Sequence, residues 1–315
     1  MDTRTAHSAH PHVLVTLFLA SREERNCEPR TLADYAYTLN LFFETPGVPA
    51  DPKRLSGDHV TLFLAHLRKR GTGPGGRESY RRRVAVFLNW LYHRDAIKRD
   101  PRKGVDRVQL VRYPLPQMTE ASLKRLLTVA VDRPRTSRGN RISAENQLRN
   151  VAILRLMWAT GMRRSEICAL LYEDVSWDVL DGDGHRVGGG ELLVRHAKGK
   201  KFRRQPFDRQ AKTALLEYIA EKRGEAAGPL FLSRSGAALT PNGLTLTLLG
   251  LERRAGVEAP SHSFRRGFAR RMRAGGLDLG EVAALMGHAT TDMTRHYSQD
   301  GETDAAIEAY RRLAG

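Results

Sequence analysis

The sequence has little cysteine and no long apolar run. Its 315 residues include two cysteines, Cys27 and Cys168, which lie far apart and offer neither a disulfide framework nor a CxxC metal knuckle. The longest apolar stretches, such as residues 13–20 and 151–160, are far shorter than the ~18 residues that span a bilayer. The amino terminus also lacks the pattern of a secretory signal. We therefore expect a cytoplasmic protein with no membrane span.

Acidic residues are scarce relative to basic ones. The chain has 52 lysines and arginines against 35 acidic residues, a formal net charge of +17. Residues 1–117 carry 20 basic and 12 acidic side chains, so the excess extends over both halves. The hydrophobic content of 41% and charged content of 28% are ordinary for a folded protein. The composition predicts two globular domains with a polyanionic partner, and nucleic acid is the first candidate.

The first hundred residues show a helical pattern of apolar side chains. Apolar positions recur at intervals of three and four in four segments. Glycine and proline near residues 45–52 and 71–76 interrupt this pattern. Four amphipathic helices follow from this pattern. The last one contains Arg81, Arg82 and Arg83, a run that either binds phosphates or forms a solvated face.

Residues 101–117 contain three prolines and lack helical periodicity, which predicts an extended linker. Beyond it, helix-start signals occur at Thr119, Thr240, Ser261 and Asp278. Two short strand-like runs, residues 191–196 and 202–207, flank the sequence Lys-Gly-Lys-Lys and predict a β-hairpin with a basic tip.

Four segments of the second half combine basic or hydroxyl side chains with glycine or a helix start. Such positions bind phosphate groups well. In order, the segments are TGMRRSE (160–166), HAKGKKFRR (196–204), SHSFRR (261–266) and LMGHATTDMTRHY (285–297). We interpret the four together as one site.

In these segments the chain resembles the tyrosine recombinases, also called phage integrases. Arg163 and the residues around it are similar to the family's first arginine box, Lys198 to its hairpin lysine, and His262 with Arg265 to its HxxR box. His288 after Met-Gly, and Tyr297 nine residues later, are similar to its closing box. Each motif alone is weak, and the four in this order make a strong signal.

The resemblance implies a mostly α-helical fold with two domains. Residues 1–100 would form a four-helix, SAM-like core-binding domain that contacts DNA, residues 101–117 a linker, and residues 118–315 the catalytic domain. The catalytic domain would be α+β, with a small antiparallel sheet, of the DNA breaking-rejoining fold. The activity implied is site-specific recombination of double-stranded DNA, with no metal or other cofactor.

The residues themselves suit this chemistry. Attack of a phenol oxygen on phosphorus builds negative charge on the nonbridging oxygens, and cations must stabilise it. The planar fork of arginine donates two parallel hydrogen bonds, so Arg163 and Arg265 are candidates to bind the phosphate from two sides. His262 and Arg265, at i and i+3, share one face of the predicted helix.

The other roles follow from proton transfer and covalent catalysis. Tyr297 is the candidate nucleophile, forming a 3′-phosphotyrosine that conserves the bond energy without ATP. Lys198, on the hairpin tip, is the candidate general acid for the leaving 5′ oxygen, although Lys200 and Lys201 occupy the same turn. His288 would bond the phosphate or the nucleophile, and Glu166 would orient Arg163 or Lys198.

Further predictions concern DNA binding and assembly. The residues expected to contact the DNA backbone are Arg81, Arg82, Arg83, Lys200, Lys201, Arg266 and Arg270. The resemblance implies a homotetramer on paired sites, and the amphipathic end of the chain is suited to docking on a neighbouring protomer in trans. Two alternatives remain, a type IB topoisomerase and a catalytically silent DNA-binding regulator of the same fold. The spacing of His288 and Tyr297 favours the recombinase.

Overall fold

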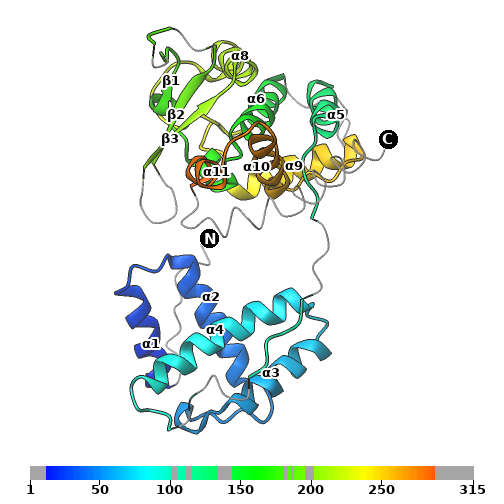
Figure 1. Ribbon diagram of the computed structural model, residues 1–315. Helices are drawn as coiled ribbons and strands as arrows, with labels where there is room; N and C mark the ends of the chain where they lie inside the picture. Colours follow the sequence, from blue (N-terminus) through cyan, green and yellow to red (C-terminus); the bar gives the residue numbers. More distant parts are fainter. Residues whose placement is uncertain are drawn as a thin grey trace. The chain divides into compact units, whose positions relative to one another are not determined.

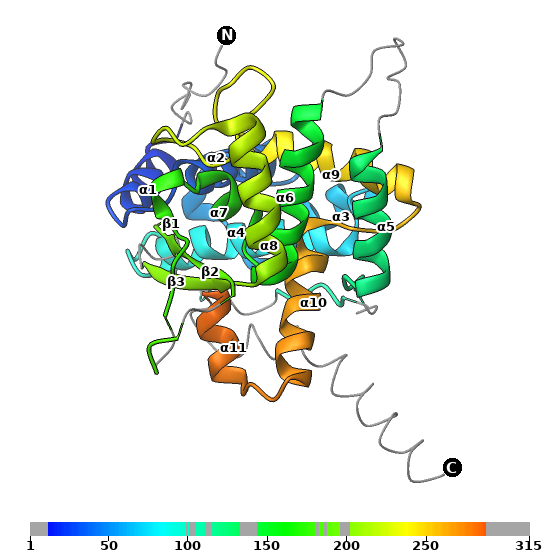
Figure 2. The ribbon, with the colours of Figure 1, turned by 90° about the horizontal axis from the view of Figure 1, so that it is seen from above.

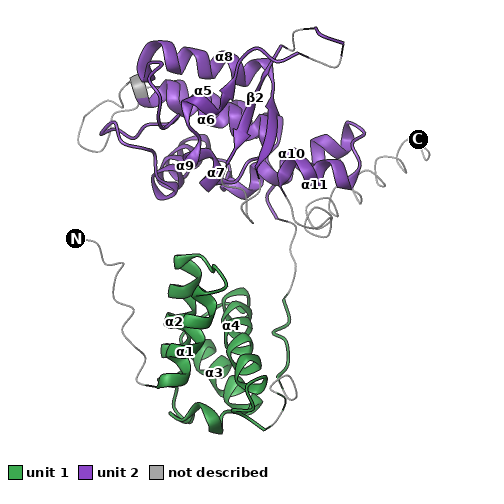
Figure 3. Ribbon diagram, turned by 90° about the vertical axis from the view of Figure 1, so that its left-hand side faces the viewer, with its two compact units in different colours: residues 1–113 green, residues 114–315 purple. Residues whose placement is uncertain are grey.

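The computed structural model describes residues 12–98, 100, 105–110, 115–132, 144–180, 183–185, 188–195 and 202–287. The chain forms two compact units that divide between Tyr113 and Pro114 (Figure 3). This division lies within residues 101–117, where the sequence predicts a linker. Each unit has a hydrophobic core of its own.

Unit 1 (residues 1–113) is helical in its described part. Its elements are α1 (Val13–Glu23), α2 (Pro29–Phe43), the 3-10 turn η1 (Pro52–Arg54), α3 (Gly57–Lys69) and α4 (Pro74–Tyr92). Each α-helix contributes an aromatic side chain to the core, and the rings meet edge-on, with Phe18 and Phe87 at 5.2 Å and Phe42 and Phe63 at 5.3 Å between centroids. The four helices predicted from apolar periodicity are confirmed.

The described parts of residues 101–117 are attached to the units that they adjoin. Val105 packs against the core of unit 1, and the N–H of Val108 donates to Glu78 on α4 at 3.2 Å. At the start of unit 2, the carbonyl of Pro116 accepts a hydrogen bond from Arg266 at 2.7 Å. The segment is therefore fixed to unit 1 near Val108 and to unit 2 near Pro116.

Unit 2 (residues 114–315) is built around a central helix. Its helices are α5 (Glu120–Val131), α6 (Ala144–Thr160), α7 (Arg164–Ala169), α8 (Arg209–Tyr218), α9 (Pro241–Ala255), α10 (Ser261–Ala274) and α11 (Leu279–Met286), with the 3-10 turn η2 (Tyr172–Asp174) and the π turn η3 (Ile219–Arg223). Helix α6 lies between α8 and α5 (Figure 2) and buries Ile153, Leu154 and Met157. Its apolar side chains therefore form the centre of the core.

A small antiparallel sheet covers one side of unit 2 (Figure 1). Its strands β1 (Val175–Ser176), β2 (Gly190–Val194) and β3 (Arg203–Phe207) are hydrogen-bonded in that order. The pairing of Leu192 with Gln205 fixes the register of β2 and β3. The two predicted strands are confirmed, with slightly different ends, whereas the two-residue strand β1 was not predicted. Strand β3 contacts α6 and α11. It therefore lies beside helices that position the candidate site.

The helix-start signals are mostly accurate. Thr119, Thr240 and Asp278 are N-caps whose side chains accept a hydrogen bond from a backbone N–H in the first turn. Ser261 instead is the first residue of α10, and Pro260 occupies the cap position. Across the described ranges, no helix combines the length and the apolar character needed to cross a membrane.

Candidate active site

The turn between α6 and α7 places the first predicted catalytic arginine. Gly161 follows the end of α6 with φ at +58°, and a Cβ there would lie 2.7 Å from Cγ of Phe268 on α10. Only glycine meets both conditions, because a side chain would be strained as well as blocked. Arg163 is the N-cap of α7, two residues after this glycine, and its side chain is 21% exposed.

Glu166 holds two arginines from different parts of the chain. Arg163 donates to its carboxylate from Nη1 and from the backbone N–H, both at 2.9 Å. Arg203 on β3 adds a bidentate pair, with Nη1 at 3.1 Å and Nη2 at 2.8 Å from the two carboxylate oxygens. Burial raises the pKa of Glu166, but the hydrogen bonds and charges of Arg203 and Arg163 outweigh it and lower the pKa overall. Glu166 is therefore an anion that contacts Arg163, one of its two expected partners.

Arg265 is buried, with 2% of its surface exposed. Its Nη1 donates to the carbonyl of Gly161 at 2.6 Å, and its Nη2 donates to the carbonyl of Met286 at 3.0 Å. A buried guanidinium requires acceptors of this kind, because desolvation without them is costly. Arg265 thereby joins the α6–α7 turn to the end of α11.

Three arginines converge on the carboxyl end of α11. The consecutive carbonyls of Leu285, Met286 and Gly287 accept from Arg203 Nε at 3.1 Å, Arg265 Nη2 at 3.0 Å and Arg163 Nη2 at 3.3 Å. The last carbonyls of a helix lack partners within the helix and carry its negative dipole end, so cations stabilise them. The arginines from the N-cap of α7, from α10 and from β3 are thus gathered at the residues that precede His288 in the chain.

His262 lies on α10 beside this cluster, with its side chain exposed to solvent. Partial desolvation by the surrounding protein lowers the pKa of His262, and the charges of Arg265, Arg266, Arg163 and Arg164 lower it further. The ring is therefore predominantly neutral at neutral pH and can accept a proton or a hydrogen bond. An approaching phosphate would offset the arginine charges and favour the protonated ring.

Three of the predicted catalytic residues, Lys198, His288 and Tyr297, lie outside the described residues, as do the alternative lysines Lys200 and Lys201. Their roles stay predictions. In the sequence, the lysines precede β3, which begins at Arg203, and His288 and Tyr297 follow α11, which ends at Met286.

The arginines of α4 differ in how they are held. Arg81 makes a bidentate pair with Glu78, at 2.8 and 2.9 Å, and its side chain is 13% exposed. Arg82 also contacts Glu78, at 3.0 Å, but is 71% exposed. Arg83 pairs with Asp34 at 3.0 Å. Of the three, Arg82 presents the most cationic surface to solvent.

Two further candidates for DNA contact lie on α10. Arg266 is 7% exposed and donates to the carbonyl of Pro116, so in this structure it is a buried structural residue rather than the surface cation that the sequence predicts. Arg270 is half-buried on the same helix. Tertiary packing explains the difference, because α10 is buried without interruption from Ser263 to Ala269 and Arg266 meets the start of unit 2 at Pro116.

Arg203 is the residue that sequence reasoning missed. It lies within the segment 196–204 noted for its positive charge, yet no role follows from that charge alone. Strand alternation groups residues 203, 205 and 207 on one face, but only the burial of Phe207 in the structure shows that this face points inward. An arginine on that inward face requires a buried anion, and Glu166 supplies it.

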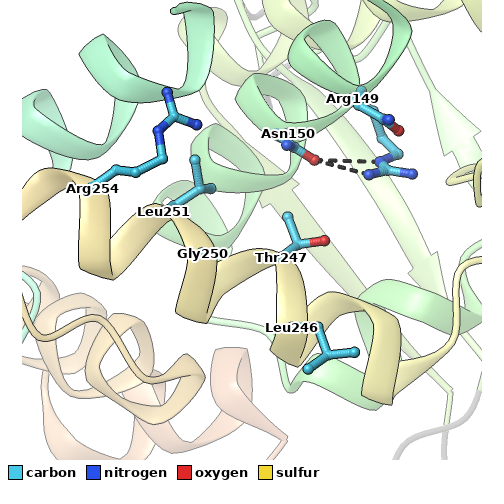
Figure 4. Close-up of a pocket in the computed structure, with 8 residues that line it drawn as sticks. Arg149, Asn150, Leu246, Thr247, Gly250, Leu251 and Arg254 are labelled. Carbon is cyan, nitrogen blue, oxygen red and sulfur yellow. Dashed lines mark hydrogen bonds between the residues drawn. The ribbon is translucent and has the colours of Figure 1, made fainter. Parts of the chain in front are cut away.

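A separate cavity of about 260 Å³ lies between α6 and α9 (Figure 4). Its lining includes Arg149, which donates to Oδ1 of Asn150 from Nη2 at 3.1 Å, and Arg254. None of the clustered arginines of the α11 end lines it. Within the described ranges, no group of three or more His, Cys, Asp and Glu side chains is placed to hold a metal ion.

Comparison with known proteins identifies the family. Residues 117–303 match the model of the phage integrase family. Tyrosine recombinase XerC of Herpetosiphon aurantiacus is 30% identical over 288 residues, covering 88% of each chain. Tyrosine recombinase XerD of Listeria innocua is 27% identical over 286 residues, covering 87% of this chain and 89% of its own.

Solved structures support the same fold. The XerH recombinase in a post-cleavage complex with its difH substrate superposes with a TM-score of 0.69 at 20% identity, over 91% of this chain and 81% of its own. The Tn1549 transposon integrase in complex with transposon end DNA gives 0.69 at 18% identity, over 96% and 99%. These likenesses concern the fold, whereas the family match covers most of unit 2 and the XerC relative covers both units. The chain therefore belongs to the phage integrase family and is a tyrosine-type site-specific recombinase.

Proposed function

We propose that this protein cleaves and rejoins double-stranded DNA at specific sites through a 3′-phosphotyrosine intermediate formed by Tyr297. One observation carries the proposal, namely the convergence of Arg163 and Arg265 on the end of α11 directly before His288, with His262 beside them. These residues come from motifs that are distant in the sequence. Their meeting at one place is what a shared phosphate site requires.

The two arginines stabilise the charge that develops on the phosphate. Among the described residues, the guanidinium of Arg163 hydrogen-bonds to Glu166 and Gly287, which uses two of its five N–H donors. The remaining donors and a partly exposed side chain suit it to bind an entering oxygen. Hydrogen-bond donors that the protein already holds in place lower the activation barrier of cleavage, because they need no reorganisation during the reaction.

In the cleavage step, the phosphoryl group is transferred from the 5′ oxygen of the DNA to the phenol oxygen of Tyr297. The phenol oxygen of Tyr297 gives its proton to a neutral histidine ring, for which His262 is suited, and bonds to phosphorus. The bond from phosphorus to the 5′ oxygen breaks, and that oxygen receives a proton from Lys198, with Lys200 and Lys201 as alternatives. Rejoining is the reverse step, in which a 5′ hydroxyl attacks the phosphotyrosine. His262 and His288 contact the phosphate or the nucleophile.

The two units have different roles in this proposal. We assign DNA contact to unit 1, corresponding to the core-binding domain (1–100) with Arg82 among its exposed cations, and catalysis to residues 118–315. The solved lambda integrase, with a TM-score of 0.66 at 14% identity, is a tetramer bound to a Holliday junction. A tetramer of this chain on paired sites, with the carboxy-terminal segment exchanged in trans, completes the proposal, and its place of action is the bacterial cytoplasm.

A covalent-capture experiment tests the proposal. The full chain is incubated with a pool of nicked duplexes of randomised sequence, so that cleavage releases a short strand and traps the adduct. Protein–DNA adducts that survive denaturation are recovered and sequenced, and the enriched duplex becomes the probe for later assays. The expected result is an adduct that Tyr297→Phe abolishes while DNA binding persists. An adduct that persists in Tyr297→Phe, or no adduct with the unchanged protein, would overturn the proposal.

A further inference from the structure

Arg203 connects the pieces of the candidate site more extensively than its place at the start of a short strand suggests. Its three guanidinium nitrogens donate to both oxygens of Glu166 and to the carbonyl of Leu285. Its side chain is 10% exposed, so these contacts are shielded from water. We propose that Arg203 is a positioning residue for strand cleavage, which holds Arg163 through Glu166 and holds the backbone before His288 through Leu285.

The path from Arg203 to Arg163 runs through one carboxylate. Glu166 lies between the two guanidinium groups, and each of its oxygens accepts from both arginines. A carboxylate held by a bidentate arginine has a fixed plane, because the fork geometry constrains both oxygens. That fixed plane in turn sets the direction in which Arg163 Nη1 and Nη2 point. Without Arg203, Glu166 would depend on Arg163 alone.

The path from Arg203 to His288 runs through the end of α11. Gly287 has φ at +62° and packs directly on the guanidinium of Arg203, since a Cβ there would lie 2.7 Å from Nη1. Together with the Leu285 hydrogen bond, this contact fixes the chain at the residue preceding His288. A shift of Arg203 would therefore move the starting point of the segment that carries both His288 and Tyr297.

The third connection is through the backbone. Arg203 pairs with Val194 at the end of the β2–β3 ladder, where the chain leaves the sheet for the residues that include Lys198. Its side-chain contacts therefore anchor the base of that segment to α7 and α11. The neighbour Arg204 points the other way, is 74% exposed and pairs with Glu191. The same strand thus supplies a matched control.

The inference rests on the proposed function, and the same nicked duplex tests it. Arg203→Lys keeps the charge but replaces the planar fork with a single ammonium group. We expect the rate of adduct formation at saturating protein to fall ~10-fold or more, because small misplacements of reacting groups are costly. DNA affinity and melting temperature should stay close to those of the unchanged protein. Arg204→Lys should change the rate by less than about twofold, as expected of an exposed pair.

A double-mutant cycle with Arg163→Lys separates positioning from a general structural effect. If Arg203 acts through Arg163, adding Arg203→Lys to Arg163→Lys lowers the rate by much less than it does alone. Fully additive losses would overturn the inference, as would a normal rate in Arg203→Lys. So would loss of DNA binding together with cleavage, which a merely structural residue would give. Absence of any Tyr297-dependent adduct in the unchanged protein defeats the proposed function, and the inference with it.

Discussion

Each unit contains a buried glutamate that holds two arginines, but the two clusters are built differently. In unit 1, Glu78 pairs with Arg81 and Arg82, three and four residues further along α4. In unit 2, Glu166 pairs with Arg163 at the start of its own helix and with Arg203, which comes from a strand 37 residues later. The first cluster therefore stabilises one helix and its attachment to Val108, whereas the second ties separate elements into a site.

The pKa values reflect this difference. In Glu78, the hydrogen bond from Arg81 is the largest influence, and the pKa falls from 4.5 to about 2. In Glu166, burial is the largest influence and raises the pKa, and the arginines are needed to bring it below its ordinary value. Glu166 is therefore kept charged at a cost in desolvation. This desolvation cost is expected where the carboxylate fixes an arginine that serves the function of the site rather than stability alone.

The sharpest test of this contrast neutralises each glutamate in turn. Glu166→Gln removes the anion between Arg163 and Arg203, and we expect cleavage of the selected nicked duplex at saturating protein to fall ~100-fold, since the arginines lose their fixed direction. Glu78→Gln should leave that rate within about twofold, because Glu78 belongs to unit 1. Rates of adduct formation measure both. Equal losses in the two variants would show that the clusters do not differ in function.

A second prediction concerns the glycine that packs on Arg203. Gly287 and Gly256 both end helices in the left-handed region, with φ at +62° and +60°. A Cβ at Gly256 would lie 3.1 Å from Nη2 of the exposed residue Arg125, whereas one at Gly287 would collide at 2.7 Å with a guanidinium held by hydrogen bonds. The two substitutions to alanine therefore share the backbone strain and differ in the collision.

We expect Gly256→Ala to destabilise unit 2 by about 1 kcal/mol and Gly287→Ala by about 2–3 kcal/mol. Scanning calorimetry of the full chain measures the loss. Gly287→Ala should also slow adduct formation, and Gly256→Ala should not. If the two variants behave alike in both assays, the contact between Gly287 and Arg203 does not contribute to the site.

The sequence was sufficient for features that depend on neighbouring residues. Apolar periodicity located α1 to α4, and the capping side chains of Thr119, Thr240 and Asp278 located three helix starts. The order of the motifs also led to the family. Each of these signals depends on residues close together in the sequence, so it can be recognised without knowledge of the tertiary structure.

The sequence was not sufficient for contacts that join distant segments. Phe202 and Phe207 lie on opposite faces of the same predicted strand, so alternation alone did not show which face, and hence whether Arg203 or Arg204, points inward. The structure leaves Phe202 66% exposed and buries Phe207. Likewise, the charge of Arg266 predicted a surface contact, and only the packing of α10 on Pro116 shows that its side chain is buried. Tertiary packing decides such cases.

The smallest expected effect is the acid dependence of the Glu78 cluster. Because the pKa of Glu78 is lowered from 4.5 to about 2 in the folded chain, the cluster contributes stability above pH 4.5 and loses it as the pH falls towards 2. Glu78→Gln should therefore lower the melting temperature at about pH 7, and the difference from the unchanged protein should narrow at about pH 3.5. Calorimetry of both proteins across this range measures the difference. Glu44→Gln, at the exposed C-cap of α2, is measured alongside as the control. A Glu78 difference that stays constant with pH would contradict the role of its charge.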